Sequence, residues 1–164
     1  SKEVVTMLKN ADFPGLKRAT SSAIYFALRT FGQWQALQPI AERVKSESLS
    51  QNCNNPAIAT ALAQKAETFL PDPKYKQIAY SLYERVLECK SSDHASRARF
   101  RYSLLKIMDQ DCKTADPILT KVYEENSQEY IGRTLYWRAR CAQMRGDRMS
   151  FEFLSQKLLK EAPL

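Results

Sequence analysis

Amphipathic segments that recur at a constant spacing constrain the fold of this chain more than any other sequence feature. Pairs of helical segments begin near Ala57, Asp93 and Glu129, in two successive steps of 36 residues. Within these segments apolar residues recur every three or four positions, which is the period of one helix face. A helix pair in each repeat of about 34–40 residues is typical of an α-solenoid, in which every pair packs on the next.

The composition supports the same fold. The chain has only 4 Gly in 164 residues, and 44% of its residues are hydrophobic, enough to build a core. We therefore expect an all-α superhelix (α-solenoid) of antiparallel helix pairs, TPR-like in architecture, with about nine or ten helices. It is predicted to be a single helical-repeat domain over residues 1–164, with helix pairs at about 57–90, 93–126 and 129–161 and N-terminal helices within 2–46.

Asparagine or aspartate followed by proline marks expected helix starts. The Asx oxygen can accept an unpaired amide hydrogen, and proline at the first helical position lacks an N–H that would have no partner anyway. These dipeptides are Asn55-Pro56, Asp72-Pro73 and Asp116-Pro117, and Ser92 and Asp93 offer another N-cap. Pro39 is expected to interrupt or start a helix. The polar stretch from Ser46 to Asn54 is expected to form an exposed loop.

The charge of the chain suits an anionic partner. Its formal net charge is +7, which fits nucleic acid, an anionic lipid surface or an acidic polymer, and also fits a helical protein whose Lys and Arg are simply solvated. No nucleic-acid-binding module is recognisable, so no specific nucleic-acid partner is predicted. No apolar run approaches the roughly 18–20 residues that a membrane-spanning helix needs.

Catalytic, metal and cofactor sites find little support. His94 is the only histidine, and its place in the first turn of an expected helix is typical of a surface residue. Zinc sites draw their ligands from short local pairs, whereas the cysteines here are tens of residues apart. The dipeptide Glu47-Ser48 lies in the polar stretch and is interpreted as part of the loop. We predict no catalytic residue, no metal site and no cofactor in this chain.

The four cysteines allow two interpretations. Antiparallel helix pairs would bring Cys53 and Cys89 to one end of the stack and Cys112 and Cys141 nearer the other end, which favours disulfides 53–89 and 112–141. A bridge between Cys89 and Cys112 would have to span a whole helix of about 25 Å, beyond disulfide reach. Alternatively, all four are reduced thiols packed as small hydrophobic side chains. Disulfides would favour an oxidising compartment.

Arginines interleaved with aromatic residues form the best candidate binding surface. They lie on equivalent helices of successive repeats and could line one concave wall, where guanidinium groups bind carboxylates or phosphates and aromatic faces stack on rings. The candidate ligand-binding residues are Arg97, Arg101, Arg133, Tyr136, Trp137 and Arg140. The alternative is that the aromatic residues are buried between helices. The arginines would then pair with Glu124, Glu125, Glu129 and Glu152.

One segment carries a family resemblance. Tyr130 to Arg140, followed by Gly146-Asp147, contains the pattern R-x-L-Y-W-x-A-R-x-x-x-x-x-G-D. This segment resembles the superhelical, helical-repeat part of bacterial soluble lytic transglycosylases, where a similar segment and one more helix lead into the catalytic domain. The family's catalytic Glu-Ser and Gly-Leu-Met-Gln motifs are not both present in this sequence. The resemblance is specific over about the final 70 residues and rests elsewhere on helix-pair architecture alone.

The resemblance implies a non-catalytic module that positions or binds peptidoglycan strands in the periplasm, for a catalytic domain outside this chain. A protein of a different class is also compatible with the sequence. A TPR-like scaffold would bind an extended acidic peptide in its concave groove, and it could be cytoplasmic with reduced cysteines. The two hypotheses differ in the partner, which is peptidoglycan in the first and an acidic peptide or protein in the second.

Overall fold

The protein is all-helical. A computed structural model describes residues 2–125 and 128–162, and this part of the chain holds eleven α-helices and no strand. The predicted fold class is therefore confirmed at the level of an all-α protein. The number of helices exceeds the expected nine or ten because the N-terminal region contains more short helices than the apolar pattern indicates.

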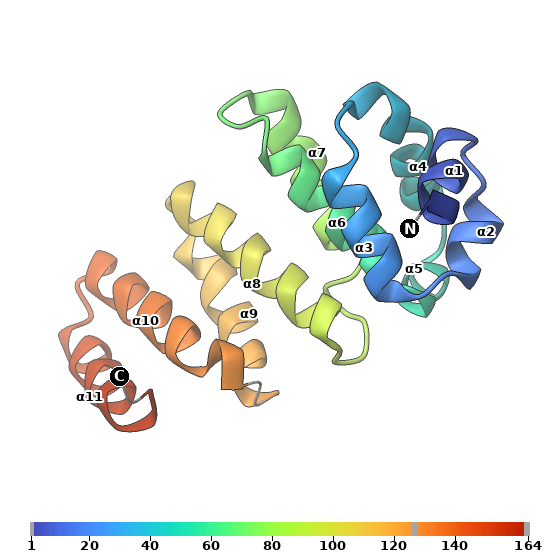
Figure 1. Ribbon diagram of the computed structural model, residues 1–164. Helices are drawn as coiled ribbons and strands as arrows, with labels where there is room; N and C mark the ends of the chain where they lie inside the picture. The colour runs from blue at the N-terminus through green and yellow to red at the C-terminus, as the bar shows by residue number, and fades with distance from the viewer. Residues whose placement is uncertain (1, 126–127, 163–164) are drawn as a thin grey trace. The chain divides into compact units, whose positions relative to one another are not determined.

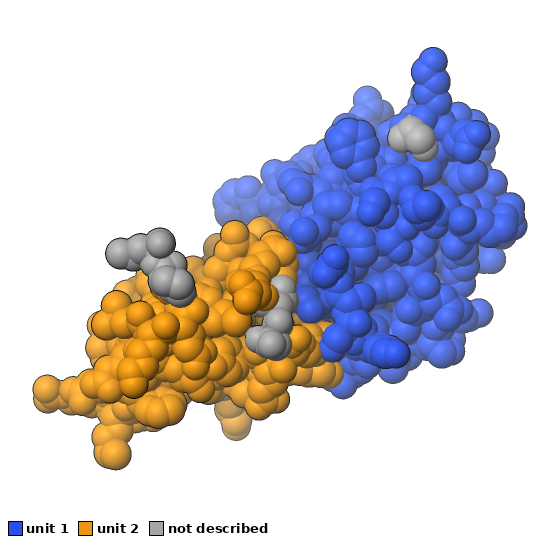
Figure 2. Space-filling model, turned by 60° about the horizontal axis from the view of Figure 1, so that its bottom comes forward, with its two compact units in different colours: residues 1–98 blue, residues 99–164 orange. Residues whose placement is uncertain are grey.

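The helices form two compact units, residues 1–98 and 99–164 (Figure 2). The predicted single helical-repeat domain stays a prediction. The first unit holds α1 (Lys2–Lys9), α2 (Phe13–Arg18), α3 (Ser21–Thr30), α4 (Trp34–Ser46), α5 (Leu49–Asn54), α6 (Ala57–Glu67), α7 (Pro73–Glu84) and the beginning of α8 (Asp93–Met108). The second holds the rest of α8, α9 (Cys112–Glu124), α10 (Gln128–Met144) and α11 (Arg148–Glu161).

Helix α6 is the centre of the first unit. It packs against α3, α4 and α7 (Figure 1), and residues all round its circumference are buried. Five of its residues are alanines, whose small side chains let neighbouring helices approach closely. Thr60 is fully buried in this helix, and its hydroxyl donates to the carbonyl of Pro56 at 2.8 Å and is 3.2 Å from the carbonyl oxygen of His94.

In the second unit α10 packs against both α9 and α11 (Figure 1). One apolar cluster joins the second half of α8 to α9 and α10, and contains Phe100, Ile107, Leu119 and Tyr130. Another joins α10 to α11 through Leu135 and the buried Leu154 on α11. Burial of one such leucine contributes about 1.5–3 kcal/mol to the stability of the folded chain, so these two apolar clusters hold the helices together.

Helices fall within each of the predicted repeats. The first pair is α6 with α7, the second α8 with α9, and the third α10 with α11. Position 126, the expected end of the second pair, lies outside the described residues. Two of the predicted caps are found: Asp72 accepts from the amide of Lys74 at 2.9 Å, and Ser92 accepts from the amide of Ala95 at 3.2 Å.

The expected loop from Ser46 to Asn54 was wrong. Helix α4 continues to Ser46, and α5 begins directly after Ser48. Ser48 and Gln51 form a capping box in which the Gln51 amide donates to the Ser48 hydroxyl at 3.3 Å and the Ser48 amide donates to Gln51 Oε1 at 2.9 Å. The polar composition of this segment gives no apolar period from which a helix could be predicted. Asn52 is the one buried residue of α5, and its side-chain amide donates to the carbonyl of Val44.

Two predicted caps were also wrong. Asn55 does not cap α6; it is buried, and its Oδ1 accepts from the hydroxyl of Ser21 at 3.1 Å. Helix α9 begins at Cys112 after the cap Asp111, five residues before Pro117. The capping aspartate is therefore an earlier one than the sequence suggested.

Both Pro117 and Pro39 lie inside their helices, so the expectation that Pro39 interrupts or starts a helix was wrong. Each proline removes the hydrogen bond to the carbonyl four residues earlier. Pro39 and Gln35 are exposed, as are Pro117 and Lys113, so water can reach the carbonyl that loses its donor. Such exposed positions lower the cost of a proline inside a helix.

One corner geometry occurs three times between helices. A residue with positive φ ends the first helix. The following aspartate donates its backbone N–H to the carbonyl five residues earlier, as in a Schellman motif. The side chain of the same aspartate then caps the next helix. The positive-φ residues and their φ values are Ala11 (51°), Gln110 (62°) and Gly146 (72°), followed by Asp12, Asp111 and Asp147. The last two corners lie 36 residues apart, at the spacing of the repeat.

Candidate functional site

Three of the predicted binding residues form an exposed stripe on α10. Arg133, Tyr136 and Arg140 follow one another at steps of three and four residues, which places them on one face of the helix. All three are exposed, and Tyr136 keeps 46% of its surface accessible. The two guanidinium groups are attached about 10.5 Å apart along the helix axis, with the tyrosine between them. We call these three residues the α10 stripe.

Salt bridges and hydrogen bonds do not lock the two arginines of the stripe in place. Arg133 Nη1 lies 3.9 Å from an oxygen of Glu129, one turn earlier, and both side chains are more than half exposed. Arg140 Nη1 donates to Gln143 Oε1 at 3.3 Å. Exposed pairs of this kind contribute about 0–1 kcal/mol, so a ligand carboxylate can replace them at small cost.

Trp137 does not share the exposed position of Tyr136. It is half-buried and packs on the cluster formed by α8, α9 and α10. Its ring meets the Tyr136 ring edge to face, with 5.1 Å between centroids. Trp137 therefore positions Tyr136 and anchors α10, which agrees with the packing interpretation for this one residue.

A hollow of about 590 Å³ adjoins Arg133, between the start of α10 and the end of α11. Its walls include Glu129 and Glu161, so both signs of charge border it. Gly132 lets the two helices approach here, because a Cβ at this position would lie 2.9 Å from the Cβ of Ala162. The glycine is therefore required by close packing in the second turn of α10, where it would otherwise be unfavourable.

The predicted residues on α8 fall in different units. Arg97 belongs to the first unit, where its Cζ lies 4.6 Å from the centroid of the Tyr25 ring. Arg101 belongs to the second unit and is half-buried. Arg99, which was not selected as a binding residue, is fully buried and pairs with Glu125 at 2.8 Å. The predicted concave wall, which joins residues of both units, stays a prediction.

Sequence reasoning missed a polar cluster around Tyr25 in the first unit. The Tyr25 hydroxyl donates to Gln64 Oε1, and Arg29 Nη1 donates to the same hydroxyl at 3.4 Å. The His94 ring lies 5.2 Å from the Tyr25 ring and is half-buried, which corrects its expected surface position. No sequence motif marks this cluster, because its members come from α3, α6 and α8.

The surroundings of His94 disfavour its charged form. Burial is the main cause that lowers the pKa of His94 below its ordinary value of 6.5, and the nearby Arg97 guanidinium lowers it further. Asp93 acts in the opposite direction. The Nδ1 atom of His94 is buried and has no hydrogen-bond partner among the described residues. The half-buried ring therefore packs beside Tyr25 in an environment that disfavours its charged form.

The cysteines are paired as disulfides. Cys53 is bonded to Cys89 in the first unit, and Cys112 is bonded to Cys141 in the second, with Cα atoms 5.3 and 5.5 Å apart. This is the pairing that the helix-pair geometry favours over 89–112. Cys112 and Cys141 lie in the core shared by α8, α9 and α10, so this bridge ties α10 to α9.

No group of three or more His, Cys, Asp or Glu side chains is arranged to hold a metal ion in the part of the chain that the structure describes. Glu47 accepts from Lys17 Nζ at 2.8 Å, and Ser48 is a helix cap, so the Glu47-Ser48 dipeptide has a structural explanation. The described helices include none that is long and apolar enough to cross a membrane.

Comparisons of the chain with protein-family models, with curated proteins and with solved structures gave no match. The α10 stripe is therefore the candidate site that the exposed side chains of this chain support best.

Proposed function

We propose that this chain is a non-catalytic superhelical module that binds peptidoglycan strands along the α10 stripe. The observation that carries the proposal is the exposure of Arg133, Tyr136 and Arg140 on one helix face. A tyrosine between two guanidinium groups suits a polymer that alternates sugar rings with peptide carboxylates, because sugars stack on aromatic faces and carboxylates accept from arginine.

The arrangement of the repeats belongs to the same proposal. Corners of the same geometry at Asp111 and Asp147, one repeat apart, support a regular stacking of helix pairs into a superhelix. The resemblance of residues 130–147 to the helical part of lytic transglycosylases supports a division of labour in which a separate domain carries the chemistry. A periplasmic location fits this function, and the two disulfides are compatible with an oxidising compartment.

A pull-down with purified peptidoglycan sacculi tests the proposal. The wild-type chain is expected to sediment with sacculi at low salt, and its affinity should fall as salt rises because charged contacts contribute. Arg133→Gln with Arg140→Gln, and separately Tyr136→Ala, should each weaken binding at least ten-fold. Unchanged binding by both variants would remove the α10 stripe from the proposal.

A matched control keeps the charge change equal. Arg145 and Arg148 are exposed beside the α10–α11 corner, so Arg145→Gln with Arg148→Gln removes the same charge away from the stripe. This control should bind within two-fold of wild type. Soluble muropeptides should not appear in the supernatant. Their release by the purified chain would show that it holds an active site of its own and would overturn the non-catalytic function.

A second candidate function, binding of an extended acidic peptide, is favoured by a different surface. A hollow of about 470 Å³ between α1 and α3 is bordered by Lys2 and Lys9, and the Phe26 side chain beside them is 64% exposed. An apolar ring and two ammonium groups that border one hollow suit a peptide that carries both carboxylates and apolar side chains. Phe26→Ala should then abolish binding of an acidic peptide without changing sedimentation with sacculi.

A further inference from the structure

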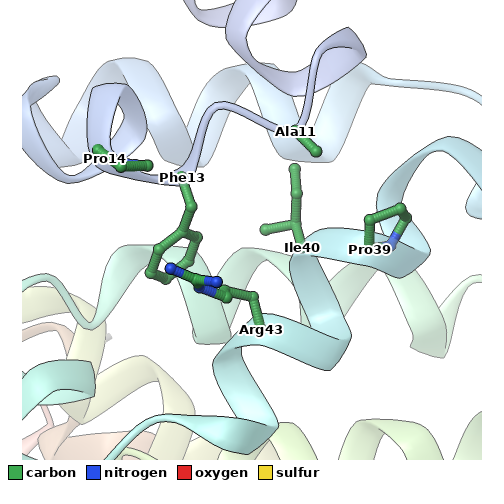
Figure 3. Close-up of a pocket in the computed structure, with 6 residues that line it drawn as sticks. All are labelled: Ala11, Phe13, Pro14, Pro39, Ile40 and Arg43. Atoms are coloured by element: carbon green, nitrogen blue, oxygen red, sulfur yellow. The ribbon is translucent and has the colours of Figure 1, made fainter.

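A pocket between α2 and α4 lies in the first unit, apart from both surfaces assigned above. Its volume is about 360 Å³, which falls within the range of small-molecule sites, about 300–1,000 Å³. Its lining residues are Ala11, Phe13, Pro14, Pro39, Ile40 and Arg43 (Figure 3). Five of the six are apolar, and Arg43 is the only one that carries a charge.

The apolar walls are held by the surrounding core. Phe13 is 5% exposed and Ile40 is 1% exposed, so their side chains are packed on the inner side. Pro14 and Pro39 are exposed and form the rim, where their rings have no rotatable bonds to immobilise when a ligand binds. The pocket is therefore preformed, with Phe13 and Ile40 as its packed inner wall and two exposed proline rings at its rim.

The charge at the pocket is incompletely compensated. Lys17 Nζ donates to Glu47 Oε2 at 2.8 Å, while Arg43 Nε lies 3.7 Å from the other oxygen of the same carboxylate. One carboxylate thus faces two cations. The Arg43 guanidinium lies over the Phe13 ring, 5.7 Å from its centroid, as its extended side chain in Figure 3 shows. Within the described chain, neither Nη atom of Arg43 has a hydrogen-bond partner.

We propose that this pocket binds the carboxylate end of a peptide whose last residue is aliphatic. The two Nη atoms of Arg43 donate to the terminal carboxylate of the peptide. This second carboxylate compensates the positive charge that remains because Glu47 alone faces both Lys17 and Arg43. The aliphatic side chain lies against Pro14 and Pro39, whose rings are exposed at the rim. Arginine suits this role because its donors form a fork that matches a carboxylate.

The size of the pocket favours a peptide end over a long acyl chain. Its volume equals that of about 12 water molecules in the liquid, at about 30 Å³ each. That space holds about two small residues with their carboxylate. A long-chain fatty acid would leave most of its methylene groups in water, and burial of those groups is the main source of its affinity.

Nuclear magnetic resonance of the 15N-labelled chain provides the test. The probe is N-acetyl-Ala-Val with a free carboxylate, and its C-terminal amide is the matched control. The free acid is expected to shift the backbone amide signals of Ala11, Phe13, Ile40 and Arg43 in a saturable manner. The amide should bind at least ten-fold more weakly. Absence of shifts with the free acid at millimolar concentration, or equal binding of the amide, would overturn the proposal.

Variants of Arg43 separate charge from shape. Arg43→Gln keeps much of the side-chain length and should weaken binding of the free acid at least ten-fold. Arg43→Lys retains the positive charge and should bind the free acid more tightly than Arg43→Gln does. Equal affinity of these two variants for the free acid would contradict a role for the positive charge. Tighter binding of octanoate than of the dipeptide would contradict a peptide occupant. Arg18→Gln, on the exposed end of α2, is the control and should bind like wild type.

This inference is independent of the proposed peptidoglycan function. The pocket lies in the first unit and the α10 stripe in the second, so variants of one leave the other intact. Loss of sacculus binding in the stripe variants with unchanged dipeptide binding would support both assignments. A dipeptide signal that disappears in the stripe variants would contradict the location of this pocket.

Discussion

Arg99 Nη1 donates to both carboxylate oxygens of Glu125, at 2.8 and 2.9 Å, although Arg99 is only 1% exposed. This pair joins α8 to the residue that follows α9. A guanidinium taken out of water is stable only when its charge and its donors are satisfied. The contact therefore constrains the core of the second unit.

Removal of one partner of this pair should be costly. Glu125→Ala leaves the Arg99 charge in the core without its carboxylate, and we expect the free energy of unfolding to fall by about 3–5 kcal/mol. Arg99→Met combined with Glu125→Leu removes both charges and should cost less than Glu125→Ala alone. Urea denaturation of the three proteins measures the difference. A double variant as unstable as the single one would show that the pair is itself strongly stabilising.

The two disulfides should stabilise their own units by similar amounts. Their loops span 36 and 29 residues, for which loss of chain entropy in the unfolded state corresponds to about 3.8 and about 3.6 kcal/mol. Replacement of Cys53 and Cys89 by alanine, or of Cys112 and Cys141, should lower the melting temperature in each case. Thiol titration of the unfolded wild-type protein without reductant should detect no reactive sulfhydryl. Four reactive thiols in protein purified under oxidising conditions would contradict the pairing.

The left-handed corners predict opposite effects of glycine substitutions. Gln110 adopts φ +62°, which is unfavourable for a residue with a Cβ by about 1–2 kcal/mol. Gln110→Gly should therefore raise the free energy of unfolding, by less than this amount because glycine has more freedom in the unfolded chain. Gly146→Ala, at the equivalent corner with φ +72°, should lower it by about 1 kcal/mol. Denaturation curves with the same slope would report both changes, and equal signs would contradict this explanation.

His94 should titrate below its ordinary pKa of 6.5, because burial and the Arg97 charge both favour the neutral ring. The unfolded chain then binds more protons than the folded chain, so stability is complete above pH 6.5 and declines as the pH falls below this value. The single histidine makes the titration easy to follow by nuclear magnetic resonance. Arg97→Gln should raise the pKa, and His94→Gln should remove this part of the pH dependence. A His94 pKa above 6.5 would contradict the observed burial.

Local sequence signals account for much of the secondary structure. The cap at Asp72 and the apolar period of residues 57–90 depend on hydrogen bonds and contacts within a few residues, so the sequence alone predicts them. Asn55 and Pro117 were misinterpreted because each has a second possible role. Asn55 is hydrogen-bonded to Ser21, 34 residues away, and Pro117 lies at an exposed position inside α9.

The candidate site likewise combines features that helical spacing predicts with features that depend on packing. Helical spacing alone places Arg133, Tyr136 and Arg140 on one face. It does not indicate that Trp137, the next residue after Tyr136, turns into the cluster of α8 and α9. Helical spacing likewise cannot decide which of the arginines on α8 is buried, because the face that becomes interior depends on the helix that packs there.

The sequence by itself determined that this chain is helical, where most of its helices begin and which cysteines could meet. Those properties follow from hydrogen bonds between near neighbours and from a repeated apolar period. Only the tertiary structure decided that Arg99 is buried with Glu125, that His94 lies beside Tyr25 and that Arg43 lines a pocket with Phe13. The pairs Arg99–Glu125, Tyr25–His94 and Phe13–Arg43 are 26, 69 and 30 positions apart. Burial and charge at such contacts depend on packing that no local pattern encodes.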